Sequence, residues 1–408
     1  MTKLRVLFVN HSGVFSGASR SLYELLRALP ADSVEACVVA PKGAMTDVLA
    51  RRGIQCVVAE AMSQFDNTRY GYYRGFRWLV LVRELAAARV TCSTIARAGR
   101  EFPDFDLVHV NESVMLLAIV IAARYYSKPI VVHVRALQRT GNDWRSRMFA
   151  AILRRYVSAV IAIDETVRRT VPDLGPVPVE VIHNSLKVSE QPASARGATC
   201  GQAKEIVVAM IGNLLRSKGC FEFLEAAALC KRDAVPARFV FVGAGVSPPP
   251  GLRRRLLRML GLDHWIEQQL RDSVAQRGLD DVVEFRSFTS DLNAVYQSID
   301  VLCFPSHLDA PGRPVFEAAY FAVPSIVAIS QPTPDTFIDG ETGINIEAGS
   351  PEQIARALRY LAEHPTERQR MGHKARELAL RNFDASKNAG MVLDLYRRVL
   401  SKQVSARG

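Results

Sequence analysis

Two carboxylates stand eight positions apart in the stretch DAPGRPVFEAAYFAVP, where Asp309 and Glu317 flank a Pro-Gly-Arg-Pro cluster. Pro314 suits the first position of a helix, because its fixed φ and missing N–H cost nothing there. This places Glu317 on the first helical turn. The free N–H groups and positive dipole end of a helix start favour phosphate or sugar oxygens, and a carboxylate can accept hydrogen bonds from two adjacent hydroxyls.

Two further groups suit such a ligand. Gly312 lets the loop backbone come close to it, since glycine has no Cβ. The junction IGNLLRSKG, residues 211–219, ends a strand and opens a helix, so its backbone donors and Lys218 can meet a diphosphate. The structural alternatives are a solvated surface lysine for Lys218, a loop cap for Asp309 and a dipole-stabilising acid for Glu317.

The first half of the chain offers two weaker candidates. Gly17 lies in HSGVFSGASRSL, residues 11–22, a turn between a strand and a helix that has a structural reading as well. His133 ends the strand IVVHV, where its side chain can face a cleft. A lone histidine is more often a structural residue, and that alternative stays open.

Short runs of β-branched and apolar residues predict the elements that position these loops. Separated by helix-length amphipathic segments, they indicate a parallel sheet with helices on both faces. In the first half these runs are RVLFVN, EACVVA, QCVVAE, LVHVN, IVVHV, AVIAI and VEVIH. The same alternation resumes later with EIVVAMIGN, ARFVFVGAG, VVEFRSF, DVLCFPS and PSIVAIS.

Between the two series, KVSEQPASARGATCGQAK is small, polar and aperiodic, as expected of a linker. We therefore predict an α/β protein with two Rossmann-like, doubly wound domains facing a central cleft, at 1–186 and 205–382, joined by a linker at 187–204. The amphipathic helix within 383–408 is free to pack across either domain. Ligands of such sheets bind at the carboxyl ends of their strands.

Composition limits the class of protein. The 408 residues are 49% hydrophobic and 23% charged, as expected of a globular chain. Seven scattered cysteines without C-x-x-C spacing argue against a disulfide framework, and no cluster has the spacing of a metal site. The start MTKLRVLFVN leaves no room for a signal peptide, and the apolar run VMLLAIVIAA is shorter than the ~20 residues of a membrane span.

Net charge is +11, and residues 1–190 carry most of it, with 25 Lys and Arg against 17 Asp and Glu. This excess suits an anionic ligand or an anionic membrane surface, although a solvated basic face is an equal alternative. No nucleic-acid motif is present, so nucleic acid is not an expected partner. The segment RYGYYRGFRWLVLVRELAAAR, residues 69–89, mixes arginines with aromatic residues; it predicts either an interfacial element, part of an acceptor site or ordinary core packing.

The motifs together resemble a known family. IDVLCFPSHLDAPGRPVFEAAYFAVPSIV followed by FIDGETGINIEAGSPEQIARAL looks like the donor site of retaining glycosyltransferases of family 4, which have the GT-B fold. FVNHSGVFSGASRSLYEL, IVVHVR, VIHNS and IGNLLRSKGCFEFLEAA extend the resemblance nearly from end to end, in the order of the family. Each motif alone is weak, but their order makes the resemblance specific.

The resemblance implies roles for individual residues. Glu317 matches the second glutamate of the family's pair, which binds the nucleotide ribose. Asp309, one methylene shorter, stands where the first glutamate binds the donor sugar. Lys218 matches a diphosphate-binding lysine, whereas Asn213 occupies an arginine position. Arg216 or Arg313 would have to compensate for that missing charge.

Two matches lie in the first domain. Gly17 matches the second of two family glycines that approach the diphosphate and acceptor, and Ser16 replaces the first. His133 aligns with a histidine that contacts the donor sugar.

The activity implied is retaining, metal-independent transfer of a sugar from a UDP- or GDP-linked donor to a glycan or lipid-linked acceptor. The implied location is the cytoplasm, peripheral at the inner face of the membrane. Two alternatives stay open: a sugar-nucleotide epimerase with the same fold, and a catalytically silent sugar-nucleotide-binding protein, which the departures at Asp309, Asn213 and Ser16 suggest.

Overall fold

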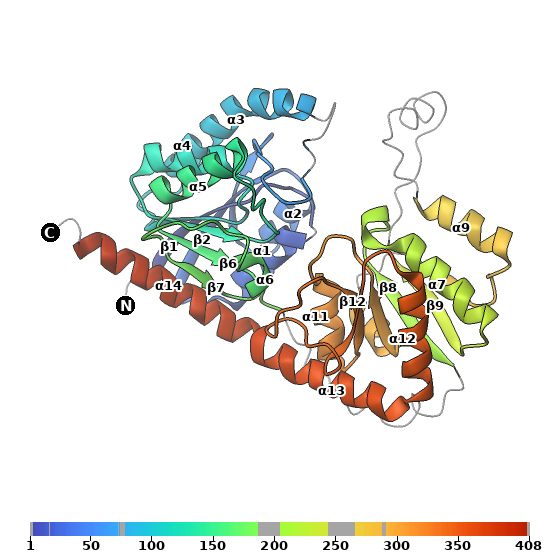
Figure 1. Cartoon of the computed structure of the whole chain (residues 1–408). Coiled ribbons are helices and arrows are strands. Elements are labelled where there is room, and N and C mark those ends of the chain that lie inside the picture. Colours follow the sequence, from blue (N-terminus) through green and yellow to red (C-terminus); the bar gives the residue numbers. More distant parts are fainter. Residues whose placement is uncertain are drawn as a thin grey trace. The chain divides into compact units, whose positions relative to one another are not determined.

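The computed structural model of the chain describes residues 3–15, 17–71, 73, 78–186, 205–243, 266–287 and 291–405 (Figure 1). The chain divides into two compact units, which we call unit 1 (Met1–Lys187 and Phe383–Gly408) and unit 2 (Val188–Asn382). Ser16 and the linker expected at 187–204 lie outside the described residues. Each unit is an α/β fold built on one parallel sheet.

Unit 1 contains a seven-stranded sheet with the order β3-β2-β1-β4-β5-β6-β7, in which every neighbouring pair is parallel. Its central strands are apolar and buried, as sheets covered on both faces require. The strands are β1 Leu4–Val9, β2 Val34–Pro41, β3 Gln55–Ala59, β4 Leu107–Val110, β5 Ile130–Val134, β6 Ala159–Ala162 and β7 Val179–Val181.

The helices of unit 1 connect these strands, except for one that comes from the other end of the chain. The connecting helices are α1 Gly17–Ala28, α2 Ala44–Ala50, α3 Val80–Glu101, α4 Leu116–Tyr126, α5 Trp144–Tyr156 and α6 Glu165–Arg168. The additional helix is α14, Ala385–Ser405, whose start is capped by Asp384 Oδ1 accepting from the Lys387 amide at 2.6 Å.

α14 completes the core of unit 1 although the whole of unit 2 separates it from the rest in sequence. Its buried stripe, including Val392, Tyr396 and Val399, belongs to the same hydrophobic cluster as Val6 and Phe8 of β1. The chain leaves and re-enters unit 1 at neighbouring points, because the Leu186 amide donates to the Phe383 carbonyl at 3.1 Å.

Unit 2 contains a six-stranded parallel sheet with the order β10-β9-β8-β11-β12-β13. Its strands are β8 Ile206–Ile211, β9 Ala237–Val242, β10 Val283–Arg286, β11 Val301–Phe304, β12 Ser325–Ala328 and β13 Gly343–Ile346. The run GINI of β13 was not anticipated as a strand, because it is short and starts with a glycine. That glycine is required, since a Cβ on Gly343 would stand 2.0 Å from the Ser325 carbonyl oxygen of β12.

The helices of unit 2 lie between these strands and after β13 (Figure 1). They are the 3₁₀ turn η3 Arg216–Lys218, α7 Cys220–Arg232, α9 Ile266–Arg277, α10 Leu292–Gln297, α11 Arg313–Tyr320, α12 Pro351–Glu363 and α13 Pro365–Asn382. Among the described helices of both units, none is long and apolar enough to cross a membrane. The six cysteines in the described ranges are free thiols.

The strand orders determine where ligands bind in such sheets. In unit 1 the order reverses between β1 and β4, and in unit 2 it reverses between β8 and β11. Loops that follow the two strands at such a switch point diverge to opposite faces and leave a crevice at the carboxyl end of the sheet. The predicted residues Gly17, Asn213, Lys218 and Asp309 all lie in or directly after these loops.

Candidate active site

The loops after β8 and β11 contact each other across the switch point of unit 2. The amide of His307 donates to the Ser217 carbonyl at 2.9 Å, and the Ser306 hydroxyl donates to the same oxygen at 3.3 Å. Gly219 has a φ of 79°, and a Cβ there would stand 2.1 Å from the Pro305 carbonyl oxygen. Glycine is therefore needed for the two loops to approach.

Phe304, the last residue of β11, lies between two of the predicted site residues. The Lys218 ammonium stands 4.8 Å from the centroid of its ring. On Gly312, a Cβ would stand only 2.2 Å from the ring carbon Cζ. The close approach that we expected Gly312 to make to a ligand is thus made to the Phe304 ring, and Lys218 and Gly312 share one aromatic surface.

Lys218 is half-buried, and burial lowers the pKa of its ammonium group. A desolvated cation that contacts a ring face is poorly compensated compared with one in water. Binding of a diphosphate beside it would restore the lost interactions.

The helix that carries Glu317 begins one residue earlier than predicted. α11 starts at Arg313 with Gly312 as its N-cap, so Pro314 is the second helical residue and the first turn contains no acid. Glu317 lies on the second turn, and our assignment to the first turn was wrong. The reason is that the first four N–H groups of a helix lack intrahelical partners, so the second position tolerates proline too.

The Glu317 carboxylate is held by two side chains. The Tyr296 hydroxyl donates to Oε2 and the Arg313 Nε to Oε1, each at 2.7 Å. The Glu317 side chain is 12% exposed and that of Arg313 16%. Glu317 is therefore held in one orientation by these neighbours.

Asp309 is anchored to the loop after β12. Its Oδ1 accepts from the Ser330 amide at 2.7 Å, and the Ser330 hydroxyl donates to Oδ1 and Oδ2 at 2.8 Å. Its backbone is left-handed, with a φ of 51°, which aspartate tolerates better than most residues. This geometry agrees with the loop-anchor alternative, because Ser330 engages both carboxylate oxygens.

The predicted cations around Asn213 are not gathered on it. Asn213 is exposed, and Gly212 before it has a φ of 132°. The Arg216 guanidinium lies 4.2 Å from the centroid of Phe221 and donates to Gln269 Oε1 at 2.7 Å, while Arg313 pairs with Glu317. Both arginines thus have partners elsewhere in unit 2, and neither is gathered on Asn213 to supply the missing charge.

In unit 1, His133 belongs to a buried chain of hydrogen bonds. Its Nδ1 lies 2.8 Å from His109 Nε2, and His109 Nδ1 lies 2.5 Å from the Tyr396 hydroxyl of α14. Burial lowers the pKa of His109 to about 3 and that of His133 well below its usual value, and Arg135 adds to both shifts. Both imidazoles are neutral at pH 7, so His133 can act as a hydrogen-bonding group but not as a cation.

The switch point of unit 1 has a polar floor. Asn111 Nδ2 donates to Asn10 Oδ1 at 2.9 Å, and Arg135 Nη2 donates to Asn111 Oδ1 at 2.8 Å. Gly17 follows as the first residue of α1, with a φ of 43° and nothing within 4 Å of where a Cβ would stand. A glycine is favoured there by the backbone conformation and leaves open space above the helix start.

A polar group beside this floor was missed by our sequence reasoning. Glu112 follows Asn111, and burial raises the pKa of its carboxyl to about 7, although Arg135 opposes the shift. His11 Nδ1 and both polar atoms of the Asn67 amide are buried without a hydrogen-bond partner among the described residues. Periodicity could not identify these residues, because they lie in loops that only the fold brings together.

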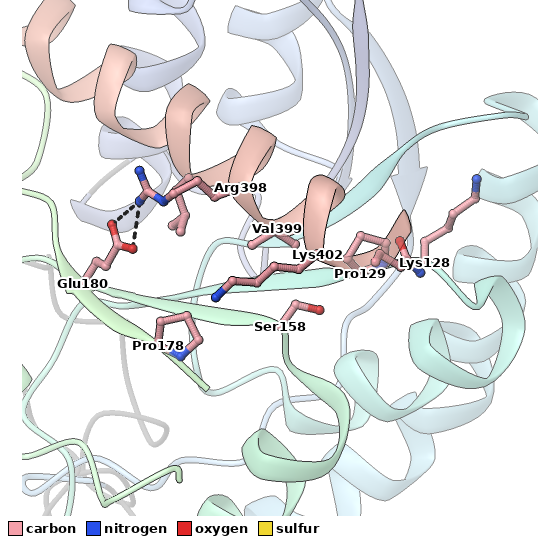
Figure 2. Close-up of a pocket in the computed structure, with 10 residues that line it drawn as sticks. Lys128, Pro129, Ser158, Pro178, Glu180, Arg398, Val399 and Lys402 are labelled. Carbon is pink, nitrogen blue, oxygen red and sulfur yellow. Dashed lines mark hydrogen bonds and ion pairs between the residues drawn. The ribbon is translucent and has the colours of Figure 1, made fainter. Parts of the chain in front are cut away.

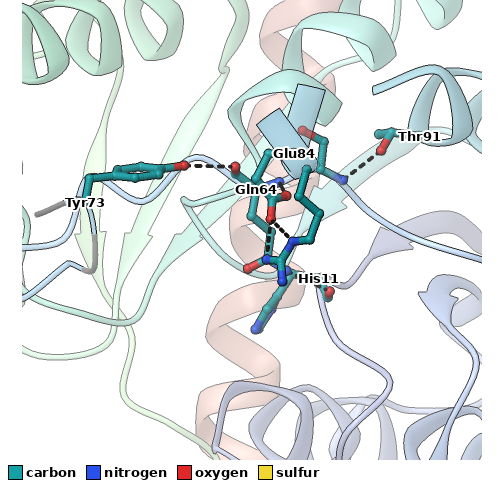
Figure 3. Close-up of polar contacts among 7 residues, drawn as sticks. His11, Gln64, Tyr73, Glu84 and Thr91 are labelled. Carbon is teal, nitrogen blue, oxygen red and sulfur yellow. Dashed lines mark hydrogen bonds and ion pairs between the residues drawn. The ribbon is translucent and has the colours of Figure 1, made fainter. Parts of the chain in front are cut away.

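The segment after β3 is fastened to α3 by side chains around Gln64 (Figure 3). The backbone N–H of Gln64 donates to Glu84 Oε2 at 2.7 Å, and the backbone N–H of Ser63 donates to Thr91 Oγ1 at 2.8 Å. Gln64 Nε2 also reaches the His11 carbonyl at 3.4 Å, which ties this segment to the loop after β1. The start of α3 is therefore connected to the switch point of unit 1.

The other missed partners are Tyr296, Ser330, Phe304 and His109. Only Phe304 carried a sequence signal, as the last residue of the strand before DAPGRP. Within the described residues, no group of three or more His, Cys, Asp or Glu side chains has the arrangement of a metal site.

Two family models match the chain. Residues 15–190 match Glycosyltransferase Family 4, and residues 199–378 match Glycosyl transferases group 1. A D-inositol 3-phosphate glycosyltransferase of Saccharomonospora viridis is 30% identical over 219 residues, which are 51% of this chain and 46% of that protein. The chain thus spans about half the length of the curated relatives that it matches.

Solved structures resemble the whole chain. Anabaena Alr3699/HepE in complex with UDP covers 97% of this chain and 100% of its own, with a TM-score of 0.74 and 19% identity. Sucrose-phosphate synthase from Thermosynechococcus elongatus has a TM-score of 0.68 at 18% identity and covers 98% of this chain and 100% of its own. At these identities the likeness concerns the fold alone.

The fold prediction is confirmed: the chain has two parallel-sheet, Rossmann-like units that match GT-B structures. The two family models together cover most of the sequence in the order of its two units. This chain belongs to the group 1 and family 4 glycosyltransferases of the GT-B fold.

Proposed function

We propose that this chain is a retaining, metal-independent glycosyltransferase that moves a sugar from a nucleotide-sugar to a glycan or lipid-linked acceptor. The observation that supports this most directly is the contact of Lys218 and Gly312 with one ring, that of Phe304, at the switch point of unit 2. Glu317 stands on the helix that Gly312 opens. A diphosphate and a ribose hydroxyl pair fit these two groups.

In this proposal the Lys218 ammonium neutralises the leaving diphosphate, and Glu317 accepts the ribose hydroxyls. Charge-assisted hydrogen bonds of this kind contribute about 1.5–3 kcal/mol each. Tyr296 and Arg313 keep the carboxylate in place before the donor arrives, which reduces the entropy cost of binding. The complex of Alr3699/HepE with UDP supports a UDP-linked donor as the first to test.

The reaction needs no protein base in this scheme. The bond between the sugar's anomeric carbon and the phosphate oxygen breaks, and the acceptor oxygen bonds to that carbon on the face that the phosphate leaves. The acceptor proton passes to the departing phosphate oxygen. The work of the protein is positioning and electrostatic stabilisation, in which Asp309 of unit 2 would contact the donor sugar. The role that the resemblance implies for neutral His133 of unit 1, a contact with the same sugar, stays a prediction.

The acceptor would bind unit 1. The polar loops around Asn111 and Glu112 offer hydrogen-bonding groups for hydroxyls, as does the buried Asn67 amide, which has no partner among the described residues. A lipid-linked acceptor is supported by the surface at the start of α3. We call the exposed side chains of Trp78, Leu79, Val82 and Leu85 the α3 apolar face.

At the start of α3 the exposed side is apolar, whereas the buried side carries a glutamate. Leu79, Val82 and Leu85 are 70%, 65% and 66% exposed, whereas Glu84 is 4% exposed and bound to the Gln64 amide. Trp78 packs between Tyr73 and Trp144, with the Arg145 guanidinium 5.6 Å from its ring centroid. Exposed aliphatic and tryptophan side chains with arginines suit the headgroup region of an anionic membrane.

Donor binding and turnover test the proposal. We expect UDP or GDP to raise the melting temperature, and Lys218→Ala to weaken that binding by roughly ten- to a hundredfold. Glu317→Gln should lower transfer; because it also breaks the ion pair with the largely buried Arg313, its melting temperature is measured alongside. Turnover should also survive excess EDTA. Binding of a nucleotide-sugar without any transfer or hydrolysis would instead support the silent binding protein.

The membrane part has its own test. The parent protein should sediment with vesicles of phosphatidylglycerol and phosphatidylcholine. This sedimentation should be lost when Val82 and Leu85 are both replaced by serine. Leu380→Ser, at a 43% exposed leucine of α13, is the matched control and should sediment like the parent protein. Equal sedimentation of all three proteins would remove the α3 apolar face from the proposal.

A further inference from the structure

Unit 1 contains a pocket at the end of its sheet opposite the loops of its switch point. Figure 2 shows residues that line it. The pocket has a volume of about 350 Å³. Pro129, Ser158 and Pro178 line it, and they directly precede strands β5, β6 and β7. The pocket therefore lies at the amino ends of these strands, whereas the loops of the switch point follow the carboxyl ends.

One face of α14 forms the wall of this pocket. Leu395, Arg398, Val399 and Lys402 line it, and their spacing of three, four and seven residues places them on one stripe of the helix. Leu395 and Val399 are buried, which leaves Arg398 and Lys402 as the charged groups of the stripe. The wall thus combines an apolar base with two cations.

The Arg398 guanidinium is oriented by the single carboxylate of the pocket. Its Nη2 donates to both oxygens of Glu180, at 2.8 and 2.6 Å. A guanidinium has five N–H donors, so those on Nε and Nη1 are not used by this pair. Glu180 therefore neutralises one cation but also holds a donor group at the rim.

The Lys402 ammonium has no hydrogen-bond or ion-pair partner among the described residues. In Figure 2 its side chain extends across the pocket toward Pro178 and Ser158. By contrast, Arg397 lies on the other side of α14. It pairs with Asp394 at 3.3 Å, as a surface cation of a helix commonly does. Lys128 lines the far end of the pocket and adds a third cation, although its side chain points away in Figure 2.

We propose that this pocket binds a small phosphate-bearing anion, with the phosphate on Lys402 and Arg398 and its organic body against Pro129, Pro178 and Val399. Arg398 and Lys402 against the single carboxylate of Glu180 leave a net positive site, and the volume is near the lower end of the range for small-molecule pockets. Arginine and lysine are the side chains that bind phosphate, and the Ser158 hydroxyl is a further donor. The ligand would be either a soluble phosphate monoester or the phosphate of a lipid headgroup.

This inference goes beyond the proposed function and does not depend on it. Titration calorimetry on the full chain, without added nucleotide, would use sn-glycerol 3-phosphate as the soluble probe. Vesicles of phosphatidylglycerol in phosphatidylcholine would test the lipid source. Each measurement compares the parent protein with Lys402→Glu and with Arg397→Glu, which makes the same charge change on the other side of α14.

We expect saturable binding that falls by about tenfold or more in Lys402→Glu and is retained in Arg397→Glu. If Lys402→Glu weakens the binding of sn-glycerol 3-phosphate, the ligand is a soluble phosphate monoester. If it weakens only the binding of vesicles, the ligand is a lipid headgroup. Equal loss in both variants would mean general charge attraction and would overturn the site, as would the absence of saturable binding in both arms. Lys402 is exposed, so its variants should fold; Lys402→Ala, with unchanged melting temperature, guards against a fold defect.

Discussion

At the scale of single residues, the two candidate carboxylates are held in part by uncharged residues outside the motif. Tyr296 and Ser330 are examples, since they fix Glu317 and Asp309 through hydrogen bonds of 2.7–2.8 Å. The sequence motif predicts which carboxylates matter but not their orientation. An exposed carboxylate would lose rotational freedom on binding a ligand, whereas a pre-oriented one loses less.

The Tyr296 hydroxyl provides the first prediction at this scale. Tyr296→Phe removes one donor to Glu317 and keeps the buried ring, which stacks on Phe321 at 5.5 Å. We expect UDP affinity to fall by roughly fivefold, about 1 kcal/mol, because the carboxylate is less well oriented. Calorimetry would measure the change. Tyr360→Phe, at an exposed tyrosine of α12, is the control, and equal affinities in all three proteins would contradict the role of Tyr296.

At the scale of elements, the strand-to-helix junctions of unit 2 depend on contacts between backbone and ring. Gly312 opens α11 against the face of Phe304, the ring that also lies beneath Lys218. The position of the helix start and the position of the lysine are therefore coupled through one side chain. The sequence predicted that the backbone at Gly312 comes close to a ligand, whereas in the structure it comes close to the Phe304 ring.

Gly312→Ala tests this coupling. A Cβ 2.2 Å from Phe304 Cζ forces the ring to move, and we expect a loss of stability of about 1–3 kcal/mol together with weaker UDP binding. Adding Phe304→Leu should relieve the clash. The double variant should then be more stable than the sum of the single effects predicts, as a double-mutant cycle would measure. Simple additivity would show that the two residues are independent.

At the scale of the whole molecule, the sequence predicted the architecture better than the site. Alternating strand runs predicted all of unit 1's strands, because buried parallel strands are strongly apolar. They missed β13, whose GINI run contains a glycine and an asparagine. The side-chain pairs were not predictable. His133 meets His109 of the neighbouring strand, and His109 in turn meets Tyr396, 287 residues further along in α14; only the folded topology brings these three together.

Buried charge predicts a dependence of stability on pH. The pKa of Glu112 is raised from its usual 4.5 to about 7, so the folded protein binds more protons than the unfolded chain between these values. Its contribution to stability is therefore greatest below pH 4.5, falls as pH rises and levels off above 7. The change should reach roughly 3 kcal/mol.

Glu112→Gln should remove this slope. We expect it to raise the melting temperature relative to the parent at pH 8 and to leave it nearly equal at pH 5. The buried histidines shift stability in the opposite direction, since their lowered pKa values remove stability as pH falls below 6.5, but they are common to both proteins. Glu60→Gln, at an exposed site, should show no pH-dependent difference; a parallel pair of curves for Glu112→Gln would refute the buried acid.

The return of α14 to unit 1 has a consequence for synthesis on the ribosome. The hydrophobic cluster around Val6 and Phe8 includes Val392, Tyr396 and Val399, which are translated only after the whole of unit 2. The hydrophobic cluster of unit 2 contains no residue from outside that unit, so this core can form first. Until α14 emerges from the ribosome, unit 1 would leave part of its apolar surface exposed. It would therefore be a substrate for chaperones during synthesis.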